Sequence, residues 1–79
     1  MKKYYSLVVS VIDEDENRVE AHEICGNNNK KEILKARSQL KNDIKAGKYD
    51  EYADFKNGET LSADIEVHDD ETYELLWIE

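Results

Sequence analysis

The chain has 79 residues, a net charge of −8 and charged side chains at 38% of its positions. This length allows one domain, residues 1–79, whose core is too small to give high stability alone, so we expect support from a partner or a second copy. Cys25 is the only cysteine, which excludes an intrachain disulfide, and no stretch approaches the roughly 18 apolar residues of a membrane helix, so we expect a soluble protein of a reducing cytoplasm.

Residues 3–12 are predicted to form an interior strand, because apolar side chains occur on both of its faces. One face carries Tyr5, Leu7, Val9 and Val11, and the other carries Tyr4, Ser6, Val8, Ser10 and Ile12. A second strand is expected over residues 18–25. Its alternation slips at Glu23 and Ile24, which a bulge or the end of the strand would explain.

The connection between these strands, "DEDEN", begins like a calcium loop, with oxygen ligands at alternate positions in Asp13, Asp15 and Asn17. Such a loop also needs a glycine at its sixth position and a glutamate at its twelfth, where this chain has Arg18 and Ile24. It also needs flanking helices. We therefore predict a solvated hairpin turn and no metal site, and retain a calcium-binding domain as the third interpretation.

A helix is predicted over residues 30–46, with Ile33, Ala36, Leu40 and Ile44 as its buried stripe. Asn29 can cap its start, in a capping box with Glu32, and Gly47 can end it in a left-handed conformation. Residues 48–57 are ambiguous, because the spacing of Tyr49, Tyr52 and Phe55 favours a short helical turn while Asn57-Gly58 would suit a hairpin. We favour the helical turn.

Two further strands complete the chain, one over residues 61–68 with clean alternation and one over residues 72–78 that is apolar on both faces. The order β-β-α-β-β predicts an α+β fold in two layers, a four-stranded, mostly antiparallel sheet with one main helix packed on one face. The first and last strands are expected in the middle of the sheet, because both are apolar on both faces.

The sheet face opposite the helix has no element left to cover it. We expect it to hold an apolar strip of Val8, Leu76 and Ile78, with acidic residues beside it: Glu20, Asp64, Glu66 and Glu74. An apolar centre with a charged rim is typical of protein interfaces. This pattern predicts a protein partner or a homodimer, with Glu20, Asp64, Glu66, Glu74, Leu76 and Ile78 as binding residues.

The charge is unevenly distributed along the chain. Residues 30–49 hold seven basic side chains and two acidic ones, a net +5, so the remaining residues carry −13. Nucleic-acid binding by the basic segment 30–48, through Lys41, Lys45 and Lys48, is the main alternative function. We disfavour it because no phosphate-binding loop or interleaved aromatic residues accompany the lysines, and the surrounding acids repel phosphates.

Acidic side chains at alternate strand positions form rows that could imitate the phosphates of nucleic acid. In size and charge the chain resembles the small acidic proteins with which phages and mobile elements inhibit host defence. This resemblance implies a regulator or inhibitor that binds a nucleic-acid-handling protein. The function we predict is therefore a small acidic protein–protein interaction module.

Catalysis is not expected, and no cofactor is implied. A thiol nucleophile needs an adjacent base, but His22 and Cys25 are three residues apart on a strand and should point to opposite faces. His22 and His68 are both expected on the acidic face, where protonation near pH 6 would make it less negative.

Overall fold

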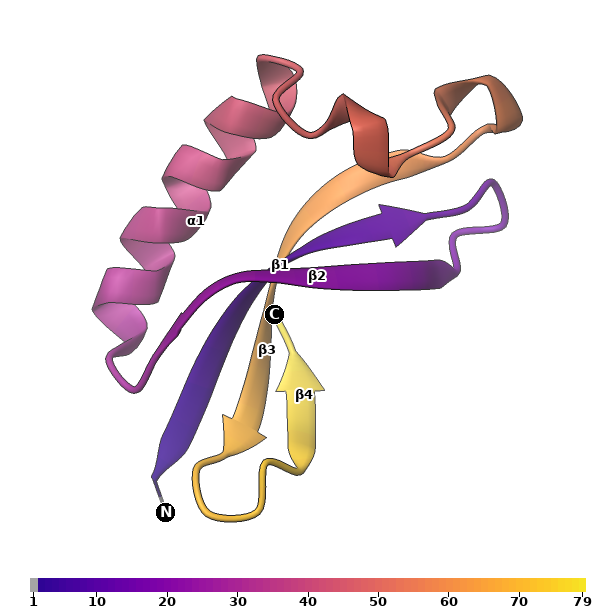
Figure 1. The fold of residues 1–79 in the computed structure, drawn as a ribbon. Helices are drawn as coiled ribbons and strands as arrows, with labels where there is room; N and C mark the ends of the chain where they lie inside the picture. Colours follow the sequence, from indigo (N-terminus) through magenta and orange to yellow (C-terminus); the bar gives the residue numbers. More distant parts are fainter. Residues whose placement is uncertain (1) are drawn as a thin grey trace.

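A computed structural model describes residues 2–79 and confirms the α+β class and the element order. Four strands form one sheet in the order β2-β1-β3-β4, with every neighbouring pair antiparallel, and α1 lies against one face (Figure 1). The elements are β1 (Lys3–Ile12), β2 (Arg18–Asn27), α1 (Lys30–Lys45), η1 (Asp50–Tyr52), η2 (Phe55–Asn57), β3 (Thr60–Asp69) and β4 (Leu75–Ile78). None of the helices in this part of the chain is long and apolar enough to cross a membrane.

The central strands are β1 and β3. The expectation that the first strand lies in the middle of the sheet is confirmed, whereas the expectation that the last strand lies there too is wrong. β4 has only four residues and lies at an edge of the sheet. Its apolar side chains on both faces reflect exposure at that edge rather than burial between two layers. β3 looks half polar in sequence, yet it is central because its polar side chains bond to one another on the face opposite α1.

The core lies between α1 and the two central strands, where apolar side chains from both layers meet. The predicted stripe of α1 is confirmed: Ile33 and Leu40 are buried, and Ala36 and Ile44 pack against the same cluster. The strand side of this cluster consists of Leu7, Val9, Ala63, Ile65 and Val67.

The ends of α1 agree with the predicted caps except in one detail. The Asn29 side chain accepts a hydrogen bond from the backbone N–H of Lys31 at 3.0 Å. The N–H of Asn29 donates to the Asn27 side chain at 2.7 Å, so Asn27 takes the part that the capping box gave to Glu32. Gly47 follows the helix with φ of +83°, a left-handed angle that favours glycine, as predicted.

The segment after α1 forms short helical turns, η1 and η2, as we favoured. Tyr49 and Tyr52 pack against the core, with ring centroids 5.7 Å apart, whereas Phe55 stays exposed.

β2 is irregular at two positions, because Val19 and Ile24 have no partner residue on β1. The bulge at Ile24 explains the slip in the sequence pattern. It also places His22 opposite Val9 and Cys25 opposite Leu7, so both side chains lie on the α1 side of the sheet. The expectation that His22 and Cys25 point to opposite faces is therefore wrong, because it assumed an unbroken alternation.

Candidate functional site

We call the sheet face opposite α1 the open face. It is hollowed, with a cavity of about 410 Å³ whose lining includes Tyr4, Val8, Glu23, Glu66 and His68. Ser6 and Val8 of β1 are buried there although no helix covers them. Long side chains from the neighbouring strands β2 and β3 reach across β1, and these contacts define the chemistry of the open face.

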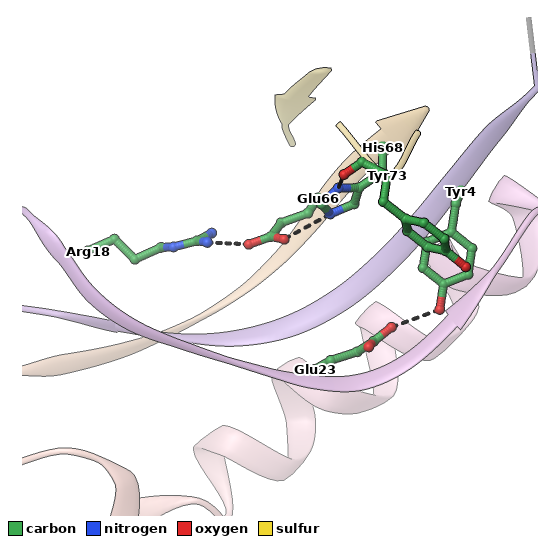
Figure 2. A network of polar contacts seen from close by, with 6 residues as sticks. All are labelled: Tyr4, Arg18, Glu23, Glu66, His68 and Tyr73. Atoms are coloured by element: carbon green, nitrogen blue, oxygen red, sulfur yellow. Dashed lines mark hydrogen bonds and ion pairs between the residues drawn. The ribbon is translucent and has the colours of Figure 1, made fainter. Parts of the chain in front are cut away.

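The first contact is a polar network that joins β2 to β3, drawn in Figure 2. One carboxylate oxygen of Glu66 is paired with the Arg18 guanidinium, and the other lies 3.0 Å from Nε2 of His68. Nδ1 of His68 lies 3.0 Å from the backbone carbonyl oxygen of Tyr73. Since both ring nitrogens face acceptors, only the doubly protonated ring donates to both.

This network is largely withdrawn from solvent. The side chains of Glu66, His68 and Arg18 are 14%, 18% and 28% exposed. The Arg18–Glu66 pair links the strands on either side of β1 and therefore crosses over β1. Glu66 thus contributes a fixed structural bond rather than a free surface charge.

The second contact joins Tyr4 and Glu23 at one end of the open face (Figure 2). The Tyr4 hydroxyl donates to Oε1 of Glu23 at 2.8 Å, and its ring meets that of Tyr73 edge to face at 5.8 Å. The Tyr4 ring passes over Gly26, where an added Cβ would lie 1.7 Å from the hydroxyl oxygen, so a side chain at this position would displace the end of the Tyr4 side chain. The hydrogen bond to the Glu23 carboxylate, together with burial, raises the pKa of Tyr4 to about 12.

Glu23→Gln should return the pKa of Tyr4 toward the ordinary value of 10.0, because a neutral amide no longer opposes the phenolate. In the unaltered chain the pKa of Tyr4 is higher in the folded state than in the unfolded state. The stabilisation by the Tyr4–Glu23 hydrogen bond is therefore complete below the unfolded-state pKa of Tyr4, and it is lost as the pH rises through the folded-state pKa. Ultraviolet difference titration of tyrosine ionisation, with Tyr4→Phe to assign the transition and Glu20→Gln as a control, measures the shift. Identical titrations for Glu23→Gln and the unaltered chain would contradict it.

The predicted binding residues are not all on one face. Asp64, Glu66 and Ile78 lie on the open face, where Ile78 is opposite Glu66 and Asp64 accepts a hydrogen bond from the Ser62 hydroxyl at 2.7 Å. Glu74 is exposed in the turn before β4.

Two of these placements are wrong, those of Glu20 and Leu76. Leu76 packs against the core on the α1 side, because a register shift in β4 at this point breaks the alternation. Glu20 lies opposite Val11 and contacts His22, whose ring stacks on Tyr52 at 4.7 Å. His22 is therefore also on the α1 side and not on the face that holds His68.

Apart from Ile78, the sequence reasoning missed a set of exposed apolar side chains on the two faces of β4 and in the turn before it. We call these residues the β4 patch: Tyr73, Leu75, Trp77 and Ile78, between 42% and 65% exposed. The sequence feature that could have identified them is the apolar run "LLWI" close after Tyr73, which the apolar pattern on both faces places in a central strand. The Nζ of Lys3 lies 5.0 Å from the centre of the Trp77 ring, and the Trp77 indole N–H donates to Glu79 at 2.8 Å, so Trp77 is held in place while exposed.

The basic residues of the alternative function separate into two groups. Lys41 and Lys45 lie on α1 beside β3, together with Arg37. Lys48 lies beyond the end of the helix and pairs with Asp43 at 3.3 Å. A hydrogen bond from Gln39, and then Lys48, lower the pKa of Asp43.

The "DEDEN" segment forms the predicted hairpin turn. Oδ1 of Asp13 accepts hydrogen bonds from the backbone N–H groups of Asp15 and Asn17, both at 2.9 Å. Glu16 has φ of 66°, a left-handed turn angle. Over residues 2–79, no group of three or more His, Cys, Asp or Glu side chains is arranged to hold a metal ion.

The chain was also compared with known proteins. No protein-family model, curated protein or solved structure matches it.

Proposed function

We propose that the chain is a protein-interaction module that binds its partner through the β4 patch. The observation that carries this proposal is a group of large apolar side chains, each more than two-fifths exposed, on an edge strand and in the turn before it. Aromatic and aliphatic side chains of this kind are the usual anchors of protein interfaces. The exposed thiol of Cys25 suits a reducing compartment, so we place the module in the cytoplasm.

The backbone of β4 supports the same surface. Glu79 exchanges both of its backbone hydrogen bonds with Ile65, so the N–H and C=O of the preceding residue, Ile78, point away from β3. The opposite edge of the sheet, β2, is interrupted by bulges at Val19 and Ile24 and carries charged side chains, which discourage pairing. β4 is therefore the edge better suited to a partner.

A second copy of the chain is the occupant that we favour. In an isologous dimer, β4 of one copy would pair antiparallel with β4 of the other, so that Leu75 and Ile78 of both copies would come together. This dimer would add the support that a 79-residue core lacks.

The narrower proposal, an inhibitor with a surface that imitates nucleic acid, receives less support from the geometry. Glu66 is occupied by Arg18 and His68, Asp64 accepts a hydrogen bond from Ser62, and Glu20 lies on the other side of the sheet. Many of the exposed acids are in the turns, with Glu74 among them.

Self-association through the β4 patch can be tested with two double substitutions on opposite edges. Leu75→Ser with Ile78→Ser should weaken dimerisation about tenfold or more, because partly exposed apolar area on both copies no longer becomes buried. Val19→Ser with Ile24→Ser, which alters similarly exposed residues on β2, should leave it unchanged. Sedimentation velocity over a concentration series measures the dimer, and circular dichroism verifies the fold.

The same two double variants also test whether the β4 patch binds a protein other than a second copy of the chain. Tagged protein would be incubated with a lysate treated with nuclease, and retained proteins identified by mass spectrometry. Two results together would exclude the β4 patch as the binding surface. The unaltered chain would be a monomer, and both double variants would retain the same proteins from the lysate.

A further inference from the structure

Half of β3 has no neighbour on the side of β4. β4 and its flanking residues pair with β3 from Ile65 to Asp69, and β3 continues from there back to Thr60 without a paired strand on this side (Figure 1). Ile65 and Glu79 exchange two backbone hydrogen bonds, of 2.9 and 2.7 Å. Since residues two apart on a strand direct their backbone groups the same way, the N–H and C=O of Ala63 and Leu61 also point to this side. They have no partner there among residues 2–79.

A groove of about 540 Å³ lies between this free edge and α1. Its apolar surface comes from Ile44, Leu61 and Ala63, and the short side chain of Ala63 leaves room above the sheet. The helix contributes three basic side chains: Arg37, Lys41 and Lys45. A groove with an apolar floor, a few placed charges and free backbone groups has the properties of a peptide site.

The acidic residues at the groove are already engaged. Glu79 accepts hydrogen bonds from the Trp77 indole and from Lys30, and these two contacts lower its pKa. Asp64 accepts from the Ser62 hydroxyl on the open face. Arg37, Lys41 and Lys45, by contrast, form no ion pair with any residue from 2 to 79. Arg37 is nevertheless close enough to Glu79 to lower the pKa of its carboxyl group further, so Lys41 and Lys45 carry the unpaired positive charge of the groove.

We propose that this groove binds an extended acidic peptide of a partner protein, which adds to β3 as a new strand beyond the end of β4. The free backbone groups of Leu61 and Ala63 would pair with the peptide backbone. Every second peptide side chain would face α1, where Arg37, Lys41 and Lys45 favour a carboxylate. The side chains between them would face the open side near Ser62 and Asp64, where a carboxylate is disfavoured. The ligand is thus a strand with acids at alternate positions.

A peptide fits these observations better than nucleic acid does. The alternating donors and acceptors of a strand edge match another peptide backbone, whereas a phosphate backbone carries acceptors only. This surface is separate from the β4 patch, so the inference does not depend on the proposed function.

The probe is a synthetic heptapeptide of alternating Thr and Glu, capped at both ends. A block isomer with its Glu residues together has the same composition and charge. We expect the alternating peptide to bind more tightly, and to slow hydrogen exchange at the amides of Leu61 and Ala63 in NMR spectra. No binding, or binding that leaves these two amides unprotected, would overturn strand addition.

Matched charge reversals test the basic wall. Lys41→Glu with Lys45→Glu should weaken peptide binding about tenfold. Lys31→Glu with Lys35→Glu makes the same change in net charge at exposed positions of α1 outside the groove, and should have little effect. Equal losses in both variants would mean that net charge alone attracts the peptide, which refutes the site.

Two further measurements separate this inference from the alternatives. The double variant Leu75→Ser with Ile78→Ser should bind the peptide normally, so failure of the β4 patch and failure of the groove are distinguishable. An oligothymidylate that binds in place of the peptide, and loses affinity with Lys41→Glu and Lys45→Glu, would assign the groove to nucleic acid and overturn the proposal.

Discussion

Glu66→Lys is expected to destabilise the folded domain by about 3 kcal/mol, the scale of removing one partner from a largely buried ion pair. The substitution removes the acceptor of Arg18 and His68 and places a second positive charge beside that of Arg18. Because the side chain at this position is only 14% exposed, solvent screens the repulsion poorly. Urea unfolding followed by circular dichroism measures the loss.

Glu74→Lys is the matched control, since it makes the same change of charge at an exposed position in the turn before β4. Its expected effect on the free energy of unfolding is within about 0.5 kcal/mol. Equal stability of Glu66→Lys and the unaltered chain would show that the network is not structural. Reversal of Glu66 alters the fold as well as the surface, so the acidic surface is better tested at Glu74.

Leu40→Ala is expected to cost about 3 kcal/mol, because it opens a cavity beneath α1. Leu40 is 2% exposed and packs in the cluster with Ile33 and Ile65. A 79-residue domain has a total stability on the order of 4 to 12 kcal/mol, so this loss would leave little margin. Thermal and chemical unfolding would both reveal it.

Leu34→Ala provides the comparison on the same helix. Leu34 is 37% exposed and lies outside the core cluster, so the same substitution should cost less than about 1 kcal/mol. Similar losses at Leu34 and Leu40 would mean that α1 presents a different face to the sheet.

Local features of the chain were predictable because their causes are local. The stripe from Ile33 to Ile44 follows from the helical period, and the cap at Asn29 and the stop at Gly47 follow from side-chain and backbone chemistry within a few residues. The turn at Asp13 belongs to the same group, since its side chain bonds to backbone two and four residues away.

The order of the strands was not predictable from the apolar character of each strand. An exposed edge strand and a doubly buried central strand both carry apolar side chains on both faces, and β4 proved to be the former. β3 gave the opposite error, since its polar side chains suggest an edge strand although it is central. The contacts that satisfy Glu66 and Asp64 in the middle of the sheet come from Arg18, His68 and Ser62. One of these partners is 48 residues away in sequence.

The bulges account for the misplaced candidate residues. One unpaired residue moves the side chains beyond it to the other face, as at Ile24 in β2 and near Leu76 in β4. His22 and Leu76 were therefore assigned to the wrong side. Glu20 lies on the same face of β2 as His22 and was therefore assigned to the wrong side with it. Asp64, on the unbroken β3, was assigned to the correct side.

The two irregularities of β2 have a consequence for assembly. A sheet with two receptive edges can add copies without limit and grow into a filament. Here Val19 and Ile24 interrupt one edge, so copies that join through β4 leave only β2 edges outermost. The assembly would then contain two copies, because the bulges of β2 prevent a third copy from adding to either outer edge.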